Sequence, residues 1–181
     1  MSKILCPVDF SDASLNALEF AVAIGEKEND SITLVNIFTP SDFNKILKTI
    51  HIKEQFENLQ EQAEKKLKAI AGEITEIGRK GGLSGCDYQL KSGQIVDSIA
   101  ELSGTGEYNL IVVGTTGHSD YERKYIGGNP KGIIKGTSCP VLCVPDGHTF
   151  HGIQRIVYAT DYQEEDKLAI QSVISLATVL Q

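Results

Sequence analysis

The chain has no apolar run that approaches the roughly 20 residues a membrane-spanning helix needs. Its start also lacks the basic region and apolar core of a secretory signal, so we expect a cytoplasmic protein without membrane contact. Positive charge is scarce: 17 Lys and Arg against 24 Asp and Glu give a net charge of −7, which disfavours nucleic acid as a partner. Only four Cys are present, and without a secretory signal we expect them to be reduced thiols.

Motifs of phosphate-transferring enzymes are missing as well. The sequence contains neither a Gly-x4-Gly-Lys-Ser/Thr loop nor a Ser-Gly-Gly-x-Asp-Ser loop, and no pair of catalytic carboxylates is evident. Cys139 and Cys143 lie in or beside an apolar run and make a poor zinc signal. We therefore expect no metal site and no enzymatic activity beyond slow ATP hydrolysis.

Short apolar runs alternate with helical patterns over the first 145 residues. The helical pattern is clearest over residues 52–77, and a further helix is expected near Pro130. Nearly all-apolar strands separated by helices are typical of a parallel sheet that is covered on both faces. The sequence therefore predicts a doubly wound α/β fold with five parallel strands, at residues 4–8, 32–38, around 88–90, 109–113 and 140–144.

The end of the chain repeats its beginning. Residues 155–162 align with residues 3–10 at a constant offset, and the match continues into the helix that follows. We predict one domain over residues 1–145, a linker over 146–154 and an extra C-terminal strand–helix unit over 155–181, an incomplete second copy of the fold. Because such a fragment cannot bury its own apolar face, we expect either a truncated tandem protein or a unit that docks elsewhere.

A glycine-rich stretch follows the fourth predicted strand. The spacing is Gly114-x2-Gly117-x9-Gly127, and Gly128 and Asn129 come next. Glycine lets a ligand approach the backbone, and the N–H groups of such a loop and of the next helix start can bind an anion. The pattern predicts a phosphate-bearing ligand, although a tight turn for close helix–strand packing would also explain it.

Two polar residues near these strand ends have alternative interpretations. Asp9 ends the first strand and either faces the crevice or caps the next helix, a role that Ser11 or Asp12 can also fill. Asn129 is expected to cap a helix whose first residue is Pro130.

Three features together resemble the universal stress protein family: the opening strand that ends in Pro-Val-Asp, the glycine spacing, and the closing strand at residues 139–144. The resemblance covers roughly residues 2–145, and the duplicated start is similar to tandem members of the family. It implies a sheet in the order 3-2-1-4-5, a homodimer formed through an edge strand and, in one branch of the family, binding of ATP, alone or with Mg²⁺.

The resemblance also implies which residues bind the nucleotide. Pro7, Val8 and Asp9 would contact the adenosine, and the backbone near Ile37 would contact the adenine edge. The ribose and phosphates would be held by Val113, Gly114, Thr115, Gly117, Gly127, Gly128 and Asn129. The ATP-binding branch has Ser or Thr where this chain has Gly128, which removes a hydrogen bond worth about 0.5–1.5 kcal/mol.

We therefore expect a non-enzymatic stress-response protein that binds an adenine nucleotide and acts as a dimer. ATP is the expected ligand, and AMP and ADP stay open. The alternative is an interaction module of the same fold with a vestigial pocket that binds no nucleotide.

Overall fold

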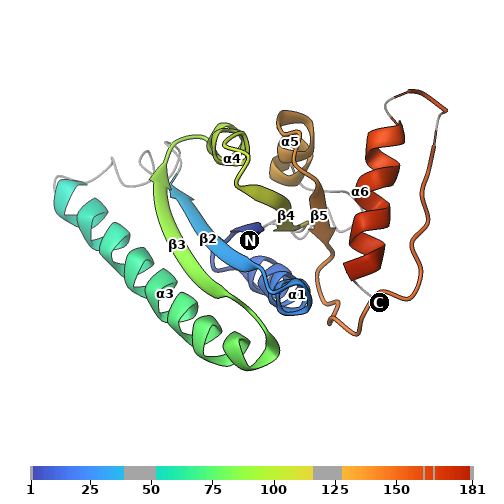
Figure 1. Cartoon of the computed structure of the whole chain (residues 1–181). Helices are drawn as coiled ribbons and strands as arrows, with labels where there is room; N and C mark the ends of the chain where they lie inside the picture. Colours follow the sequence, from blue (N-terminus) through green and yellow to red (C-terminus); the bar gives the residue numbers. More distant parts are fainter. Residues whose placement is uncertain (1, 39–51, 116–127, 161, 165, 180–181) are drawn as a thin grey trace.

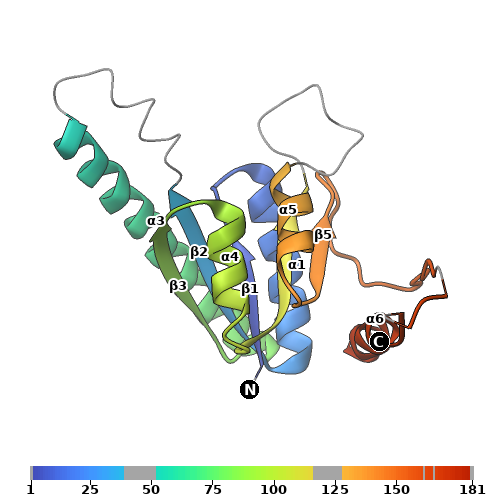
Figure 2. The ribbon, with the colours of Figure 1, turned by 90° about the horizontal axis from the view of Figure 1, so that it is seen from above.

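The computed structural model describes residues 2–38, 52–115, 128–160, 162–164 and 166–179. This part of the chain forms a five-stranded parallel sheet with helices on both faces (Figures 1 and 2). The strand order is β3-β2-β1-β4-β5. The predicted α/β fold and the predicted order 3-2-1-4-5 are confirmed.

The elements of the first domain lie close to their predicted positions. The strands are β1 (Lys3–Pro7), β2 (Ser31–Phe38), β3 (Gly85–Ser92), β4 (Tyr108–Gly114) and β5 (Val141–Val144). The helices are α1 (Asp12–Glu28), α3 (Ile52–Gly81), α4 (Ile95–Ser103), α5 (Gly128–Gly136) and the C-terminal α6 (Asp166–Val179).

Two apolar layers enclose the sheet. The helices α1 and α3 cover one face, where the core includes Ile4 and Leu67, and α4 and α5 cover the other, where it includes Leu5 and Ile133 (Figure 2). Ile4 and Leu5 are consecutive residues of β1 and both are fully buried. Because successive side chains of a strand point to opposite faces, a strand with two covered faces must be apolar throughout.

Helix starts at the carboxyl end of the sheet differ in part from the prediction. Ser11 caps α1, and its Oγ accepts a hydrogen bond from the N–H of Ser14 at 3.3 Å. The helix α5 begins at Gly128, so Asn129 lies in its first turn and the prediction that Asn129 is the capping residue is wrong. Gly128, which follows the last glycine of the predicted spacing, is the first residue of this helix.

The C-terminal unit forms only half of what was predicted. The helix α6 is present, but residues 151–160, which are described throughout, contain no strand, so the strand predicted from residue 155 is not formed. The matching strand β1 pairs with β2 on one edge and β4 on the other, and residues 155–160 have no such neighbours in the described part of the chain. A single extended segment cannot satisfy its backbone groups in a ladder without them.

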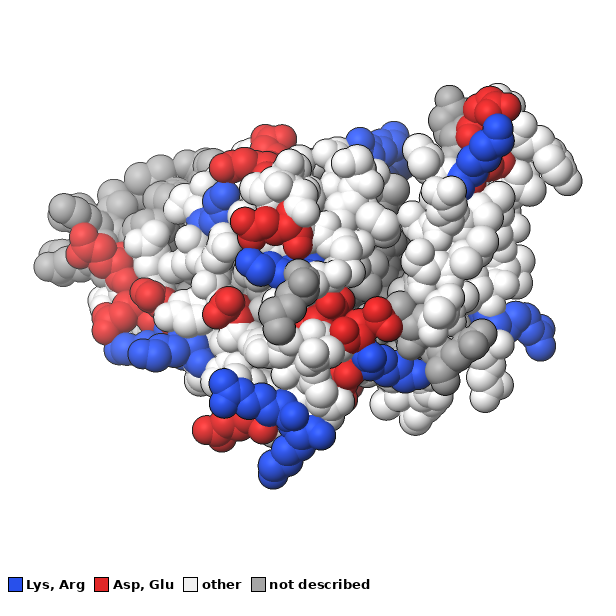
Figure 3. All heavy atoms as spheres, in the orientation of Figure 1, with Lys and Arg blue, Asp and Glu red and all other residues white. Residues whose placement is uncertain are grey.

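The segment before this unit and the helix α6 are attached to the first domain by a few apolar contacts. The Phe150 ring packs edge-on against the Phe20 ring of α1 with 5.2 Å between centroids, and Ile153 and Leu176 contact the core on the α1 face. The helix α6 stands beside β5 (Figures 1 and 2), and Leu168 on it is 71% exposed. On the face drawn in Figure 3 this region is mainly uncharged, with charges gathered near the start of α6. The assignment of residues 155–181 to a second copy stays a prediction.

Candidate functional site

A cavity of about 170 Å³ opens at the carboxyl ends of β1, β2 and β4. The strands β1 and β4 are neighbours, and their connections leave in opposite directions along the sheet, to β2 and to β5. Sheets of this kind bind ligands outside the carboxyl ends of the strands at such a switch point. The cavity therefore lies where the strand order predicts a binding site.

Most of the predicted binding residues surround this cavity. Nine of the eleven line it: Pro7, Val8, Asp9, Ile37, Val113, Gly114, Thr115, Gly128 and Asn129. The other two, Gly117 and Gly127, lie outside the described residues. The fold thus brings together the ends of three strands and the start of α5, which are far apart in the sequence.

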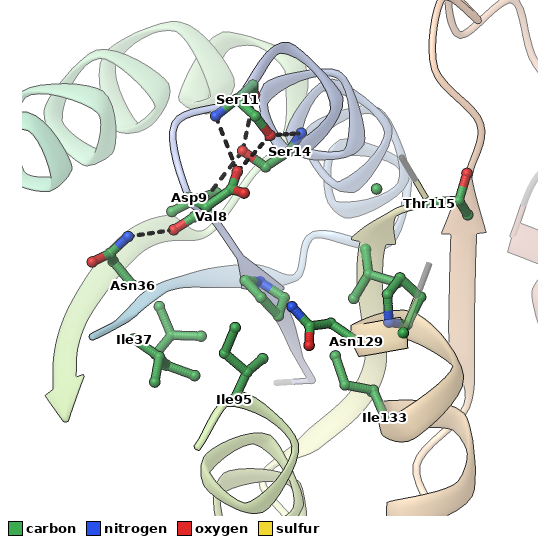
Figure 4. A pocket seen from close by; sticks show the side chains of 16 residues that line it. Val8, Asp9, Ser11, Ser14, Asn36, Ile37, Ile95, Thr115, Asn129 and Ile133 are labelled. Carbon is green, nitrogen blue, oxygen red and sulfur yellow. Dashed lines mark hydrogen bonds between the residues drawn. The ribbon is translucent and has the colours of Figure 1, made fainter. Parts of the chain in front are cut away.

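Asp9 lies on the polar wall of the cavity, in the loop between β1 and α1 (Figure 4). Its Oδ1 accepts hydrogen bonds from the backbone N–H of Ser11, at 3.0 Å, and from the Ser11 hydroxyl. Its own N–H donates to the Oγ of Ser14 at 3.3 Å. The carboxylate therefore holds the turn before α1 and borders the cavity, whereas the cap of α1 is Ser11 and not Asp9.

The serines of this turn line the same wall. Ser11 was predicted only as a helix cap, and Ser14 was not predicted at all. Ser11 is the N-cap of α1 and Ser14 is its third residue, so the spacing of three residues places both at the start of the helix, next to the loop that carries Asp9. This spacing was the signal in the sequence.

Asn36 joins β2 to the end of β1 at the edge of the cavity. It is 8% exposed, and its Nδ2 donates a hydrogen bond of 2.7 Å to the carbonyl oxygen of Val8. The N–H of Val8 in turn donates to the carbonyl of Val35 at 2.8 Å. Sequence reasoning missed Asn36, although a polar residue inside an otherwise apolar strand was a signal for it.

The opposite wall is apolar. Ile37 lies near the end of β2, Ile95 is the first residue of α4, and Ile133 lies in α5 (Figure 4). Val35 and Pro130 also line the cavity, and of these five apolar residues only Ile37 was among the predicted binding residues. Helical periodicity places Ile95 on the buried side of its helix, but it does not distinguish a side chain that lines a cavity from one that fills a core. One apolar and one polar wall suit a ligand with a flat apolar ring and hydroxyl groups.

The two glycines that line the cavity, Gly114 and Gly128, differ in the space that a side chain would have. A Cβ atom at Gly114 would lie 2.5 Å from the carbonyl oxygen of Ala13, so this glycine lets the first turn of α1 approach β4. The packing explanation therefore holds at this position. A Cβ atom at Gly128 would meet nothing within 4 Å among the residues that the structure describes, so these residues leave room for a side chain there.

The electrostatics of the cavity come from backbone groups and one carboxylate. The described lining residues include no Lys, Arg or His. The start of α5, at Gly128 and Asn129, lies at the cavity. The first N–H groups of a helix have no partner within the helix, and the positive end of the helix dipole lies there, so this end of α5 favours an anion. Across the described ranges, no group of three or more His, Cys, Asp or Glu residues could hold a metal ion.

Neither the cysteines nor the described helices indicate a further kind of site. The four cysteines are free thiols, and burial raises the pKa of Cys139 to about 11, so this thiol is protonated at neutral pH. Of the helices that the structure describes, none has the length and apolar character to cross a membrane.

Comparisons with known proteins agree with this architecture. Universal stress protein MJ0531 of Methanocaldococcus jannaschii is 29% identical over 142 residues, which cover 78% of this chain and 81% of that protein. The solved structure of a universal stress protein from Archaeoglobus fulgidus has a TM-score of 0.70 at 19% identity and covers 98% of this chain, which in turn spans 63% of that one. A universal stress protein solved in complex with cAMP has a TM-score of 0.54 at 21% identity, with 80% of this chain and 96% of that one covered.

The model of the universal stress protein family matches residues 1–145, which is the whole five-stranded domain together with both walls of the cavity. The chain belongs to the universal stress protein family.

Proposed function

We propose that the cavity binds an adenine nucleotide and that the chain is a non-enzymatic stress-response protein of the cytoplasm. The observation that carries the proposal is a cavity at the switch point of the sheet, lined by nine of the eleven residues predicted for nucleotide binding. The relative of similar fold that was solved with cAMP supports an adenine nucleotide as the ligand class.

The two walls suggest how the nucleotide lies. The adenine ring packs on the apolar wall of Ile37, Ile95 and Ile133, and the ribose hydroxyls hydrogen-bond to Asp9. The phosphates extend past Thr115 towards the start of α5, where backbone N–H groups favour an anion. A volume of 170 Å³ is below the ~300–1,000 Å³ of most small-molecule sites, so the cavity holds the nucleoside and the phosphates lie at its mouth.

This arrangement favours binding over turnover. Phosphoryl transfer needs positive groups on the transferring phosphate, and the described lining offers helix and backbone N–H groups but no Lys or Arg. ATP, alone or with Mg²⁺, would then act as a ligand that favours one conformation or assembly. The assembly we propose is a homodimer formed through an edge strand of the sheet.

The direct test is calorimetric titration of the purified chain with ATP, ADP, AMP and cAMP. We expect binding of at least one of them and a raised melting temperature. Asp9→Asn keeps the acceptor for Ser11 but removes the charge, and we expect about tenfold weaker binding, or about 1.4 kcal/mol. Asp12→Asn, on an exposed side chain of the same helix start, is the matched control and should bind as the native chain does. Neither heat nor a melting shift at millimolar nucleotide would refute the proposal.

The vestigial-pocket alternative rests on Gly128, which lacks the hydroxyl found in the ATP-binding branch. Since a side chain at position 128 meets open space, Gly128→Ser can be introduced without a clash. If the native chain binds no nucleotide and the variant does, the alternative is correct. If both bind and the variant binds a few-fold more tightly, nucleotide binding is native to the chain.

A further inference from the structure

A second cavity lies at the opposite end of the sheet from the first. It has a volume of about 490 Å³ and is enclosed by the last turns of α1, the starts of β4 and β5, and the helix α6. This volume falls within the ~300–1,000 Å³ that small-molecule sites usually have. The cavity uses no residue of the proposed nucleotide site, so its function is a separate question.

Most of its wall is aliphatic. Ile24 of α1, Leu110 of β4 and Leu142 of β5 form the side towards the domain, and Val173 and Leu176 of α6 form the other side. Apolar surface that borders open space of this size is unfavourable in water, and burying it is worth about 25 cal/mol per Å². An apolar group that fits between α6 and the sheet would gain this free energy.

One end of the cavity is acidic. Glu28 and Asp30 both line it, and the described lining residues include no Lys, Arg or His. Asp30 is 5% exposed, and its Oδ2 accepts a long hydrogen bond of 3.4 Å from the side-chain amide of Asn109. Burial raises the pKa of Asp30, so the charged form of this carboxyl is less well solvated than it would be in water. A buried carboxylate with amide donors is stabilised further by a cation that reaches it.

We propose that this cavity binds an amphipathic organic cation: an aliphatic or ring body between α6 and the sheet, with one protonated amine at Asp30 and Glu28. The aliphatic wall selects the body, and the two carboxylates select the charge. Neutral and anionic molecules of the same shape satisfy only the first requirement. The pairing of a ligand-sized apolar cavity with an acidic end carries the proposal.

The test is a calorimetric titration of the full chain with n-octylamine as its ammonium salt, with 1-octanol and octanoate as matched probes. We expect one ammonium bound per chain, at least tenfold weaker binding of octanol, and no binding of octanoate. Equal binding of the amine and the alcohol, or several amines bound per chain to the exposed apolar residues of α6, would overturn the proposal.

Substitutions locate the site. Asp30→Asn and Glu28→Gln each remove one carboxylate, and we expect each to weaken amine binding, Asp30→Asn by tenfold or more. Glu28→Gln is at a solvent-exposed helix position and keeps the test valid if Asp30→Asn does not fold. Glu19→Gln, an exposed carboxylate of the same helix outside the cavity, should leave binding unchanged. Unchanged amine affinity in Glu28→Gln and Asp30→Asn, or in Glu28→Gln alone if Asp30→Asn is unfolded, would contradict the assignment.

Discussion

At Gly114, both the fold and the candidate site depend on the absence of a Cβ atom. A Cβ atom there would lie 2.5 Å from the carbonyl oxygen of Ala13, 2.7 Å from its carbonyl carbon and 3.2 Å from its Cβ. Two of these three are backbone atoms, which cannot rotate away as the end of a flexible side chain can. Gly114→Ala therefore requires the first turn of α1 to move away from β4.

The expected cost is that of overpacking a filled site, about 1–3 kcal/mol. Urea unfolding should show a lower midpoint at unchanged slope, and the melting temperature should fall by roughly 2–4 °C for each kcal/mol in a chain of this size. Since the displaced turn carries Ser11 and Ser14, which line the first cavity, ligand binding there should weaken with the stability.

Gly128→Ala is the matched control. The new methyl group meets no described residue within 4 Å, and residue 128 is the first residue of α5. We expect unchanged or slightly higher stability, by up to about 1 kcal/mol, because alanine restricts the unfolded chain. If Gly114→Ala is as stable as the native chain within a few tenths of a kcal/mol, the close approach of α1 to β4 is not as described and the reasoning fails.

Two further predictions concern buried polar groups. Asn36→Ala leaves the carbonyl of Val8 without its 2.7 Å side-chain donor, and we expect a loss of about 1–3 kcal/mol in urea unfolding; a loss below 0.5 kcal/mol would show that solvent replaces the donor. Burial raises the pKa of the Asp30 carboxyl, so the folded chain holds the proton of this group more tightly than the unfolded chain does. The ionised carboxylate therefore lowers the stability most at pH values above the pKa that Asp30 has in the folded chain. The stability of the native chain should therefore rise relative to that of Asp30→Asn as pH falls from neutral towards 3.8, the ordinary pKa of an aspartate. A relative stability that stays constant or falls over this range would contradict this reasoning.

Local patterns were sufficient to predict the architecture of the first domain. Apolar strands such as 3–7 and helical spacing between them predicted a two-sided parallel sheet, and the family resemblance added its order. The same combination placed Asp9 and Gly114 at one cavity, because the carboxyl ends of neighbouring parallel strands lie at the same edge.

The missed features depend on contacts that are distant in the sequence. Ile95 and Ile133 line the cavity only because α4 and α5 pack over the same sheet face, which their periodicity does not reveal. The strand predicted from residue 155 has the composition of β1, but a strand forms only where partners exist. The second cavity needs α6 beside β5, and no motif encodes that placement.

The repeated turn has a consequence for how the chain folds. Phe10 and Tyr162 occupy matching positions and both adopt left-handed φ angles, of 64° and 62°. One turn follows β1, which pairs with strands on both sides, and the other follows residues 155–160, which belong to no strand of the described chain, so this conformation does not require the sheet. Contacts between near neighbours form faster than pairing between distant strands, because they close shorter loops. We therefore expect the turn before α1 to form early in refolding, before β1 pairs with β2 and β4.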